Sequence, residues 1–136
     1  MRSLVAEDDN VAREVLVALL SRFGTVEAQV EGSAAIAAVK RALDHRRHFD
    51  IICLDIMMPG TDGKAALAAF RRLEAENGLM GNQRAAVVMT TALKDAATIV
   101  GAFREEADGY LVKPVTRTGL YEVLRKAGVP SIPDDA

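Results

Sequence analysis

Five side chains that could do chemistry follow short apolar runs of the sequence: Glu7, Asp8, Asp55, Thr91 and Lys113. In an open parallel sheet, ligands bind beyond the carboxyl ends of the strands, so side chains that follow such strands meet at one edge. Carboxylates crowded at this edge repel one another, and a bound divalent cation relieves the repulsion. Because oxygen-only ligands favour Mg²⁺, the three acids predict a magnesium site.

The same edge has the groups needed to accept a phosphoryl group. With Mg²⁺ bound, the Asp55 carboxylate can attack phosphorus and form an aspartyl phosphate. The transferring group spreads negative charge over oxygens that Mg²⁺, the Lys113 ammonium and the Thr91 hydroxyl can each bind. Ala92, directly after Thr91, leaves space near the reacting carboxylate. The spacing therefore predicts a phosphoacceptor site centred on Asp55.

The apolar patterns alternate between strand and helix along the chain. Strands are expected over 4–6, 26–30, 51–54, 85–89 and 110–112. Helical spacing follows over 12–23, 32–43, 66–73, 99–103 and 120–127. The run 26–30 alternates as an edge strand with one solvated face would, whereas 51–54 is continuously apolar, which is typical of a central strand. These repeats predict an α/β fold with a doubly wound parallel sheet.

Length, charge and composition exclude several classes of protein. The 136 residues fit one domain, expected over 1–127, with 128–136 as a tail or linker stub. The net charge of −2 lacks the basic excess of a nonspecific nucleic-acid binder, and no apolar run approaches the ~20 residues that span a membrane. Glu7 comes too early for a signal peptide, and the single Cys53 suits a reducing compartment. We therefore expect a cytoplasmic protein that binds neither nucleic acid nor membrane directly.

Four segments at the ends of the expected strands resemble the receiver domain of two-component response regulators. They are Leu4 to Asp9, Asp55 to Gly63, the pair Thr91-Ala92, and Gly109 to Pro114. The likeness covers about residues 2–127. It implies the flavodoxin-like (βα)5 fold with strand order 2-1-3-4-5, similar to single-domain chemotaxis regulators. It also implies a switch in phosphorelay signalling, not an enzyme that turns over external substrates.

The resemblance also implies roles at the acidic edge. Asp55 would take the phosphoryl group from a sensor histidine kinase or a histidine phosphotransfer protein. Asp8, Asp55 and the backbone carbonyl of Met57 would bind Mg²⁺ directly, and Glu7 mainly through a coordinated water. Lys113 would bind the phosphoryl group and precede a cis peptide bond to proline.

A second set of implied roles concerns the output. Thr91 and Tyr110 would form a switch pair, with Thr91 drawn to the phosphoryl group and Tyr110 turning inward. The changed surface would be that of the fourth helix, the fifth strand and the fifth helix, where a partner protein binds. The downstream target stays unnamed, and a phosphorylation-dependent homodimer stays open.

Two apolar residues occupy the positions that tune dephosphorylation in the family. Met57 lies two residues after Asp55, and Leu93 lies two residues after Thr91. Neither side chain can hold an attacking water by a hydrogen bond, and both can shield the phosphoryl group. We therefore expect slow autodephosphorylation.

Other functions remain as alternatives to the switch. A small phosphohydrolase could use an aspartyl phosphate, but such enzymes commonly have a second acid where Met57 stands. A phosphorylation-independent binding module could share the fold. Flavin binding is disfavoured, because the acids after the first strand would repel a phosphate.

Several polar residues are expected to have structural or solvated places. Asp9 or Asn10 should cap the first long helix, and Asp62 should cap the third. Arg71 and Arg72 are expected on a solvated helix face. His45 and His48 are expected to be solvated in a polar loop.

Overall fold

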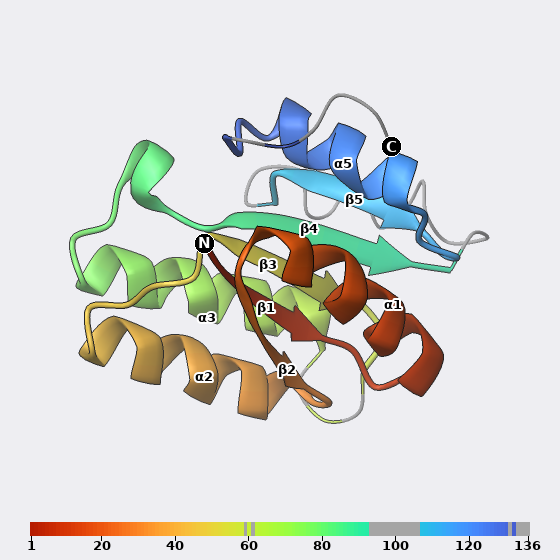
Figure 1. Cartoon of the computed structure of the whole chain (residues 1–136). Coiled ribbons are helices and arrows are strands. Elements are labelled where there is room, and N and C mark those ends of the chain that lie inside the picture. Colours follow the sequence, from red (N-terminus) through yellow and green to blue (C-terminus); the bar gives the residue numbers. More distant parts are fainter. Residues whose placement is uncertain (59, 61, 93–106, 131, 133–136) are drawn as a thin grey trace.

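The computed structural model has one parallel sheet at its centre and describes residues 1–58, 60, 62–92, 107–130 and 132. The strands are β1 (Arg2–Ala6), β2 (Thr25–Gln29), β3 (Ile51–Asp55), β4 (Ala86–Thr91) and β5 (Gly109–Val112). They pair in the order β2-β1-β3-β4-β5, all parallel (Figure 1). The predicted fold class and strand order are confirmed.

Helices cover both faces of the sheet (Figure 1). One face carries α2 (Gly32–Asp44) and α3 (Gly63–Glu76), which pack against each other. The other carries α1 (Asn10–Leu20), continued by a 3₁₀ turn to Phe23, and α5 (Arg117–Lys126). The helix expected over 99–103 lies outside the described residues.

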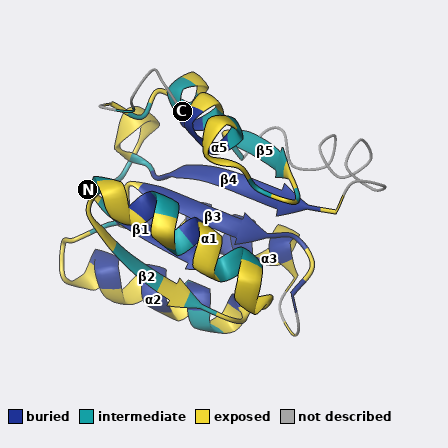
Figure 2. Cartoon of the chain, turned by 45° about the vertical axis from the view of Figure 1, so that its right-hand side comes forward, coloured by how far each residue is buried: buried dark blue, intermediate teal, exposed yellow. Residues whose placement is uncertain are grey.

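Two apolar clusters fill the space between the sheet and its helices. Leu4, Ile52, Leu54 and Met89 point toward α2 and α3, whereas alternate residues such as Cys53 point toward α1 and α5. Every residue of β3 and β4 is buried, which explains why 51–54 is continuously apolar (Figure 2). The central strands are therefore rigid supports for the residues that follow them.

The edge strand β2 differs from the alternation expected of it. Val26 packs against the apolar cluster under α1 and α5, but Ala28 is exposed and Val30 is 46% exposed. β2 has only one neighbouring strand, so half of its surface lacks a cover. Its place at the edge is confirmed, but the prediction of one regularly buried face is wrong.

Three helices begin at a side chain that accepts a backbone N–H. Asp9 accepts from Ala12, and Asp62 accepts from Ala65, both at 2.8 Å, while Thr116 caps α5. Each cap satisfies an N–H that has no partner inside its helix. The predicted capping roles of Asp9 and Asp62 are confirmed.

A buried ion-pair network joins α3 to the starts of β4 and β5. Arg71, 8% exposed, donates to Glu74 at 2.8 Å, to Asp108 at 2.9 Å and to the Ala85 carbonyl at 3.0 Å. Glu74 and Asp108 also accept backbone N–H groups of Ala85 and Val87. The prediction that Arg71 lies on a solvated face is wrong, whereas Arg72 is exposed.

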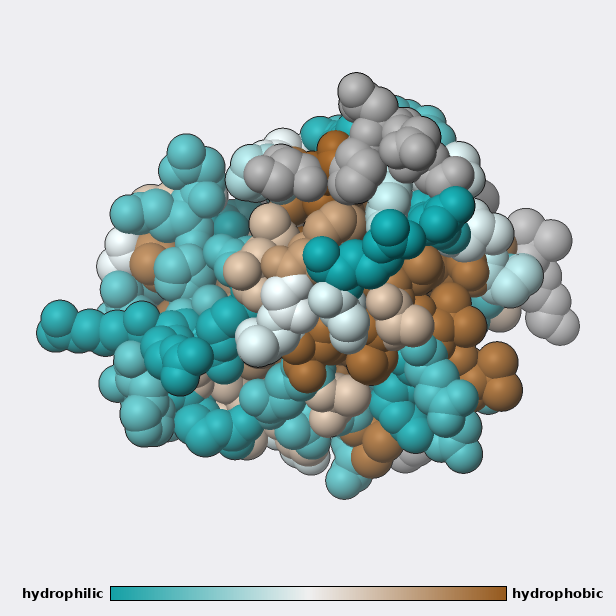
Figure 3. Space-filling view, in the orientation of Figure 1, coloured by the Kyte–Doolittle hydropathy of each residue, from teal (hydrophilic) through white to brown (hydrophobic). Residues whose placement is uncertain are grey.

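Apolar side chains remain exposed on α1. Val11 is 70% exposed and Val15 is 38% exposed. Figure 3 shows hydrophobic surface over this helix, on the side where β5 ends. An exposed apolar patch of this kind often marks a contact surface.

The structure also bears on two further expectations, one about membrane-spanning helices and one about the residues that follow α5. Within the described residues, no helix combines the length and apolar character needed to cross a membrane. Beyond α5, Val129 and Ile132 pack against the apolar cluster formed with α1 and α5. This segment therefore contributes to the core of the domain.

Replacing Arg71 tests the buried network. Arg71→Met should lower the free energy of unfolding by about 3 kcal/mol, because the buried carboxylate of Glu74 would lose its ion-pair partner. Urea denaturation measures the change. Arg72→Met is the matched control and should stay within about 0.5 kcal/mol of wild type. Equal losses in the two variants would contradict a special role for Arg71.

Candidate functional site

Three acidic side chains converge at the carboxyl ends of β1 and β3. Glu7 and Asp8 follow β1, and Asp55 ends β3, which lies directly beside β1. One oxygen from each carboxylate lies within 4.8 Å of the others. Glu7 is fully buried and Asp55 is 3% exposed, whereas Asp8 is exposed. The structure therefore brings together the three acids that the sequence predicted at one edge.

A single lysine bridges the two buried acids. The Lys113 Nζ atom lies 2.8 Å from Glu7 Oε1 and 3.3 Å from Asp55 Oδ2. The Lys113 backbone N–H donates to the Thr91 carbonyl at 2.8 Å, which fixes the end of β5 against the end of β4. The peptide bond between Lys113 and Pro114 is cis, as the resemblance implied.

The charges and the burial at this edge raise the pKa values of both Asp55 and Lys113. Burial, hydrogen bonding to Glu7 and repulsion by Glu7 raise the pKa of Asp55 to about 7, although the Met57 N–H and Lys113 act to lower it. Burial lowers the pKa of Lys113, but its ion pairs with Glu7 and Asp55 outweigh that and raise the pKa above its ordinary value. The edge thus lacks positive charge when Asp55 is ionised.

This donor set fits a hard divalent cation. Glu7, Asp8 and Asp55 offer carboxylate oxygens only, close enough to share one ion. The raised pKa of Asp55 shows that lysine alone leaves its negative charge poorly balanced. Glu7, Asp8 and Asp55 are thus the side chains that could hold Mg²⁺, and the roles of direct ligands for Asp8, Asp55 and the Met57 carbonyl stay predictions.

The two threonines at the end of β4 point to opposite faces of the sheet. Side chains two residues apart in a strand lie on the same face. Thr90 therefore lies on the face of Val88, toward α1 and α5, and Thr91 lies on the face of Met89, toward α2 and α3. Tyr110 pairs with Met89 and packs on the same side. Thr91 and Tyr110 therefore share one face of neighbouring strands, as a switch pair requires. Thr91 is 2% exposed, and its hydroxyl donates to the Ala92 carbonyl.

Of the two positions expected to tune dephosphorylation, the structure describes only Met57. The Met57 side chain is 71% exposed beside the acidic edge, and its N–H donates to Asp55 Oδ1 at 3.1 Å. Leu93 lies outside the described residues, so the expectation for it stays a prediction.

Two residues support the site without having been singled out in the sequence. Arg13 donates to the carbonyls of Glu7 and Asp8, at 3.1 and 3.3 Å, and so holds the loop that presents both acids. Gly63 approaches the loop after β3 so closely that an added Cβ would lie 2.7 Å from Ile56 Cα. The glycine was visible only as part of a turn-rich segment, and the arginine had no sequence signal beyond its place one turn into α1.

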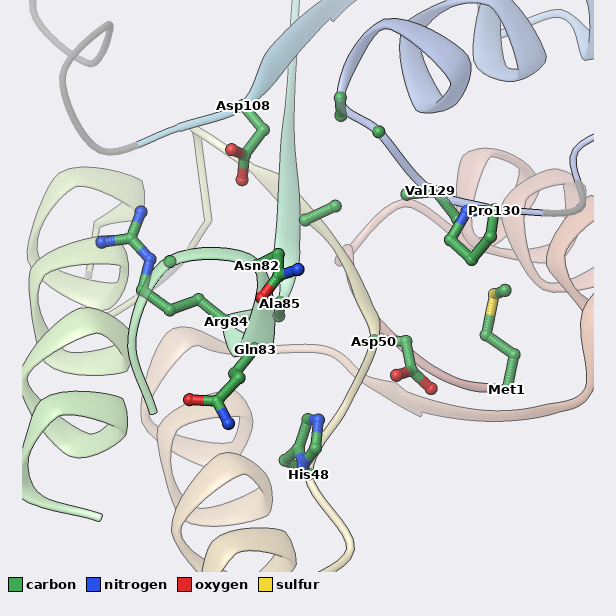
Figure 4. Close-up of a pocket in the computed structure, with 14 residues that line it drawn as sticks. Met1, His48, Asp50, Asn82, Gln83, Arg84, Ala85, Asp108, Val129 and Pro130 are labelled. Atoms are coloured by element: carbon green, nitrogen blue, oxygen red, sulfur yellow. The ribbon is translucent and has the colours of Figure 1, made fainter. Parts of the chain in front are cut away.

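A polar hollow of about 180 Å³ lies at the other edge of the sheet, where the strands begin. Figure 4 shows His48, Asp50 and Asn82 on one side of it, and Met1 and Pro130 on another. It gathers an imidazole, carboxylates and amides, but it lacks the tight group of acids and lysine found beyond Asp55. The acidic edge is therefore the better candidate for chemistry among the described residues.

Comparison with known proteins assigns this arrangement to a family. The model of the response regulator receiver domain family matches residues 4–125. The chain belongs to this family. It is a receiver domain of two-component signal transduction. Receiver domains bind Mg²⁺ at an acidic site, and Glu7, Asp8 and Asp55 form an acidic cluster in this chain.

Relatives of the receiver domain occur in larger proteins. It is 35% identical to the positive alginate biosynthesis regulatory protein of Pseudomonas aeruginosa over 131 residues, covering 96% of this chain and 48% of that protein. It is 36% identical to the sensor protein GacS of Pseudomonas syringae pv. syringae over 122 residues, covering 88% of this chain and 12% of that protein. The chain thus spans about half or less of these relatives.

Solved structures share the fold of this receiver domain. The receiver domain of the histidine kinase CKI1 from Arabidopsis thaliana, complexed with Mg²⁺ and BeF₃⁻, has a TM-score of 0.80 and 24% identity, covering 93% of this chain and 89% of that one. The chemotaxis protein CheY4 of Vibrio cholerae has a TM-score of 0.73 and 24% identity, covering 93% and 97%. These likenesses establish the architecture.

The raised pKa of Asp55 predicts how stability depends on pH in the metal-free receiver domain. The folded state keeps a proton on Asp55 up to about pH 7, whereas the unfolded chain loses it near its ordinary pKa of about 3.9. The folded state thus binds more protons between about pH 4 and 7, so stability falls as pH rises through that window.

Asp55→Asn should remove this loss, which amounts to at most about 4 kcal/mol for a shift of this size. Unfolding in EDTA at pH 5 and pH 8 measures it. Asp44→Asn, on an exposed ion pair, is the control and should keep the wild-type pH dependence. An Asp55→Asn variant that loses as much stability as wild type at pH 8 would show that Asp55 is ionised without cost.

Proposed function

We propose that Asp55 accepts a phosphoryl group from a phosphohistidine of a sensor histidine kinase or a histidine phosphotransfer protein. The observation that carries the proposal is the position of its carboxylate. Asp55 is nearly buried, lies 3.3 Å from the Lys113 ammonium, and lies within ligand-sharing distance of Glu7 and Asp8. A nucleophile needs this combination of positioning and nearby positive charge to attack a phosphoryl group.

The transfer forms one bond and breaks one bond at phosphorus. An Asp55 carboxylate oxygen forms a bond to phosphorus while the bond from phosphorus to the donor's imidazole nitrogen breaks, and the imidazole leaves with the electron pair. Lys113 stabilises the negative charge on the phosphoryl oxygens. Glu7, Asp8 and Asp55 could hold Mg²⁺, which would supply further positive charge for the transfer. Asp55 must be ionised to attack, which metal binding favours.

Phosphorylation alters the charge balance on which the ends of β4 and β5 depend. The phosphoryl group adds about −1.5 to −2 charges at a lysine already shared by two acids. Thr91, which binds Lys113 through its backbone, is drawn toward the new oxygens, and Tyr110 follows on the same face. The surface of β5 and α5, together with the fourth helix that the sequence predicts, then changes its affinity for a partner protein.

The same features disfavour the two rivals. A phosphohydrolase turns over its donor, but the side chain two residues after Asp55 is an exposed methionine that cannot activate water. A phosphorylation-independent binding module would gain nothing from a buried carboxylate whose pKa is raised to about 7. The apolar Met57 and Leu93 lead us to expect slow autodephosphorylation, which suits a switch more than a hydrolase.

An apolar hollow beside the acceptor gives the donor protein a place to dock. It has a volume of about 320 Å³ and joins α1 to the end of β5, lined by Asp9, Val11, Ala12, Val15, Lys113, Pro114 and Val115. The exposed valines of α1 border it, and Lys113 connects it to Asp55. A helix that carries the phosphohistidine can bury its apolar face here while its imidazole faces Asp55.

Phosphoryl transfer to Asp55 is tested by intact mass after incubation with Mg²⁺ and a small phosphodonor such as phosphoramidate. Wild type should gain a single acid-stable, base-labile adduct, and Asp55→Asn should gain none. Asp50→Asn, at the other end of the same strand, is the matched control and should gain the adduct. An adduct that persists in Asp55→Asn would overturn the assignment, and rapid donor turnover without accumulation would favour the phosphohydrolase.

The docking hollow is tested by comparing two kinds of donor. Val15→Asp should slow transfer from a histidine-phosphorylated kinase or phosphotransfer protein by about tenfold or more, because a charge in an apolar contact must be desolvated. Transfer from phosphoramidate should change less than about twofold. Ala18→Asp, also exposed on α1 but outside the hollow, is the control. Equal slowing with both donors would place the effect in the chemistry and not in docking.

A further inference from the structure

A cationic corner lies at the edge of the molecule where β1 begins and α2 ends. Its side chains come from three segments that the fold brings together: Arg2 of β1, Arg41 of α2, and His45 and Arg47 of the loop that follows α2. Figure 1 shows the loop that follows α2 running toward the N-terminus of the chain, and Figure 3 shows that this end of the molecule is largely hydrophilic. The corner is thus remote from the acids that follow the other end of β1.

Two neighbouring hollows open at this corner. One, of about 190 Å³, is lined by Arg2, Glu27, Ala38, Arg41, Ala42, His45 and Arg47. The other, of about 240 Å³, is lined by Arg2, Ser3, Thr25, Val26, Glu27, Arg47 and Phe49. Because Arg2, Glu27 and Arg47 line both, the two hollows share a wall of charged side chains. Each is large enough to hold a group of a few heavy atoms in addition to water.

The Arg2 guanidinium is held in place but lacks an acceptor. Its Cζ atom lies 4.9 Å from the centroid of the Phe49 ring, a cation–π contact that holds the group against the ring. Its Nη1 atom is buried and makes no hydrogen bond to any residue that the structure describes. A buried donor of this kind requires an acceptor, because leaving it unpaired costs free energy. Because Arg2 lines both hollows, a shift of its side chain brings this unpaired nitrogen to an acceptor held there.

The charges around the first hollow do not balance. Three guanidinium groups line it, and Glu27 is its one carboxylate. Glu27 is already bound by the Arg41 guanidinium and by Gln29, whose amide donates at 2.9 Å. Within the part of the chain that the structure describes, Arg47 makes no ion pair. Two positive charges thus remain for an occupant to neutralise.

We propose that this corner binds the phosphate group of a small ligand, separately from the phosphoryl group at Asp55. A phosphate monoester carries about −1.5 to −2 charges near neutral pH, which matches the excess charge of the hollow. Guanidinium groups bind phosphate oxygens through paired hydrogen bonds, and Arg2 and Arg47 reach both hollows. The second hollow gives space for the remainder of a small phosphorylated molecule.

The test is a titration of the full chain with inorganic phosphate and, separately, with adenosine monophosphate. EDTA and Asp55→Asn keep phosphate from the magnesium site, and chloride at matched ionic strength corrects for screening. Backbone amide resonances report the location of binding. Saturable shifts should appear at residues 25–27 and 41–47, with a dissociation constant in the millimolar range or below for at least one of the two anions.

Arg47→Gln and Arg46→Gln separate a built site from general attraction. Both residues are exposed, adjacent and equally charged, but only Arg47 lines the hollows. Arg47→Gln should weaken binding about tenfold or more, because it removes a charge-assisted pair of hydrogen bonds. Arg46→Gln should weaken it less than about twofold.

Two results would overturn the proposal. One is the absence of saturable shifts at the corner with both anions, which would assign the polar acceptor of Arg2 to water. The other is equal weakening by Arg46→Gln and Arg47→Gln, which would reduce binding to diffuse charge. A response to inorganic phosphate alone supports a free-phosphate site, and a tighter response to the monophosphate supports a phosphorylated metabolite.

Discussion

The structure depends most on two buried carboxylates that share one ammonium group. Glu7 and Asp55 end neighbouring strands, and Lys113 bridges them at 2.8 and 3.3 Å. Burial of the Asp55 carboxylate is the main cause of its raised pKa, and the neighbouring Glu7 raises it further, because one ammonium does not offset two negative charges away from water. The folded domain therefore keeps an electrostatic deficit at this edge, and a metal ion or a proton is what can relieve it.

Charged side chains are paired where β4 and β5 begin and are unbalanced where the strands end. Where β4 and β5 begin, Arg71 satisfies Glu74 and Asp108 within a closed network that also binds backbone groups. Where the strands end, the acids are left short of positive charge. The start of β5 is thus anchored while its end, at Lys113, depends on the occupancy of the acidic edge. A change in charge at that edge therefore acts first on Lys113 at the end of β5 and on Thr91, whose carbonyl accepts the Lys113 N–H.

The sequence was sufficient wherever local pattern and parallel topology decide the outcome. Acids and lysine that follow apolar runs had to meet at one edge, and the caps at Asp9 and Asp62 required only a short side chain before a helix. It was insufficient where a distant partner decides. Arg71 looked like half of a solvated pair because its partner Asp108 lies 37 residues away. Ala28 fits an alternating strand, but nothing in the pattern shows that its face lacks a cover.

The acidic edge and the cationic corner lie at opposite ends of the same strand. Arg2 begins β1 and Glu7 follows its last residue, so about five residues at roughly 3.3 Å each separate them. This distance excludes a hydrogen bond or ion pair between the two ends, so an anion bound at the corner does not contact the acids that follow β1. The net charge of −2 thus conceals two separate regions of opposite sign, and the ligands that we propose for them bind independently.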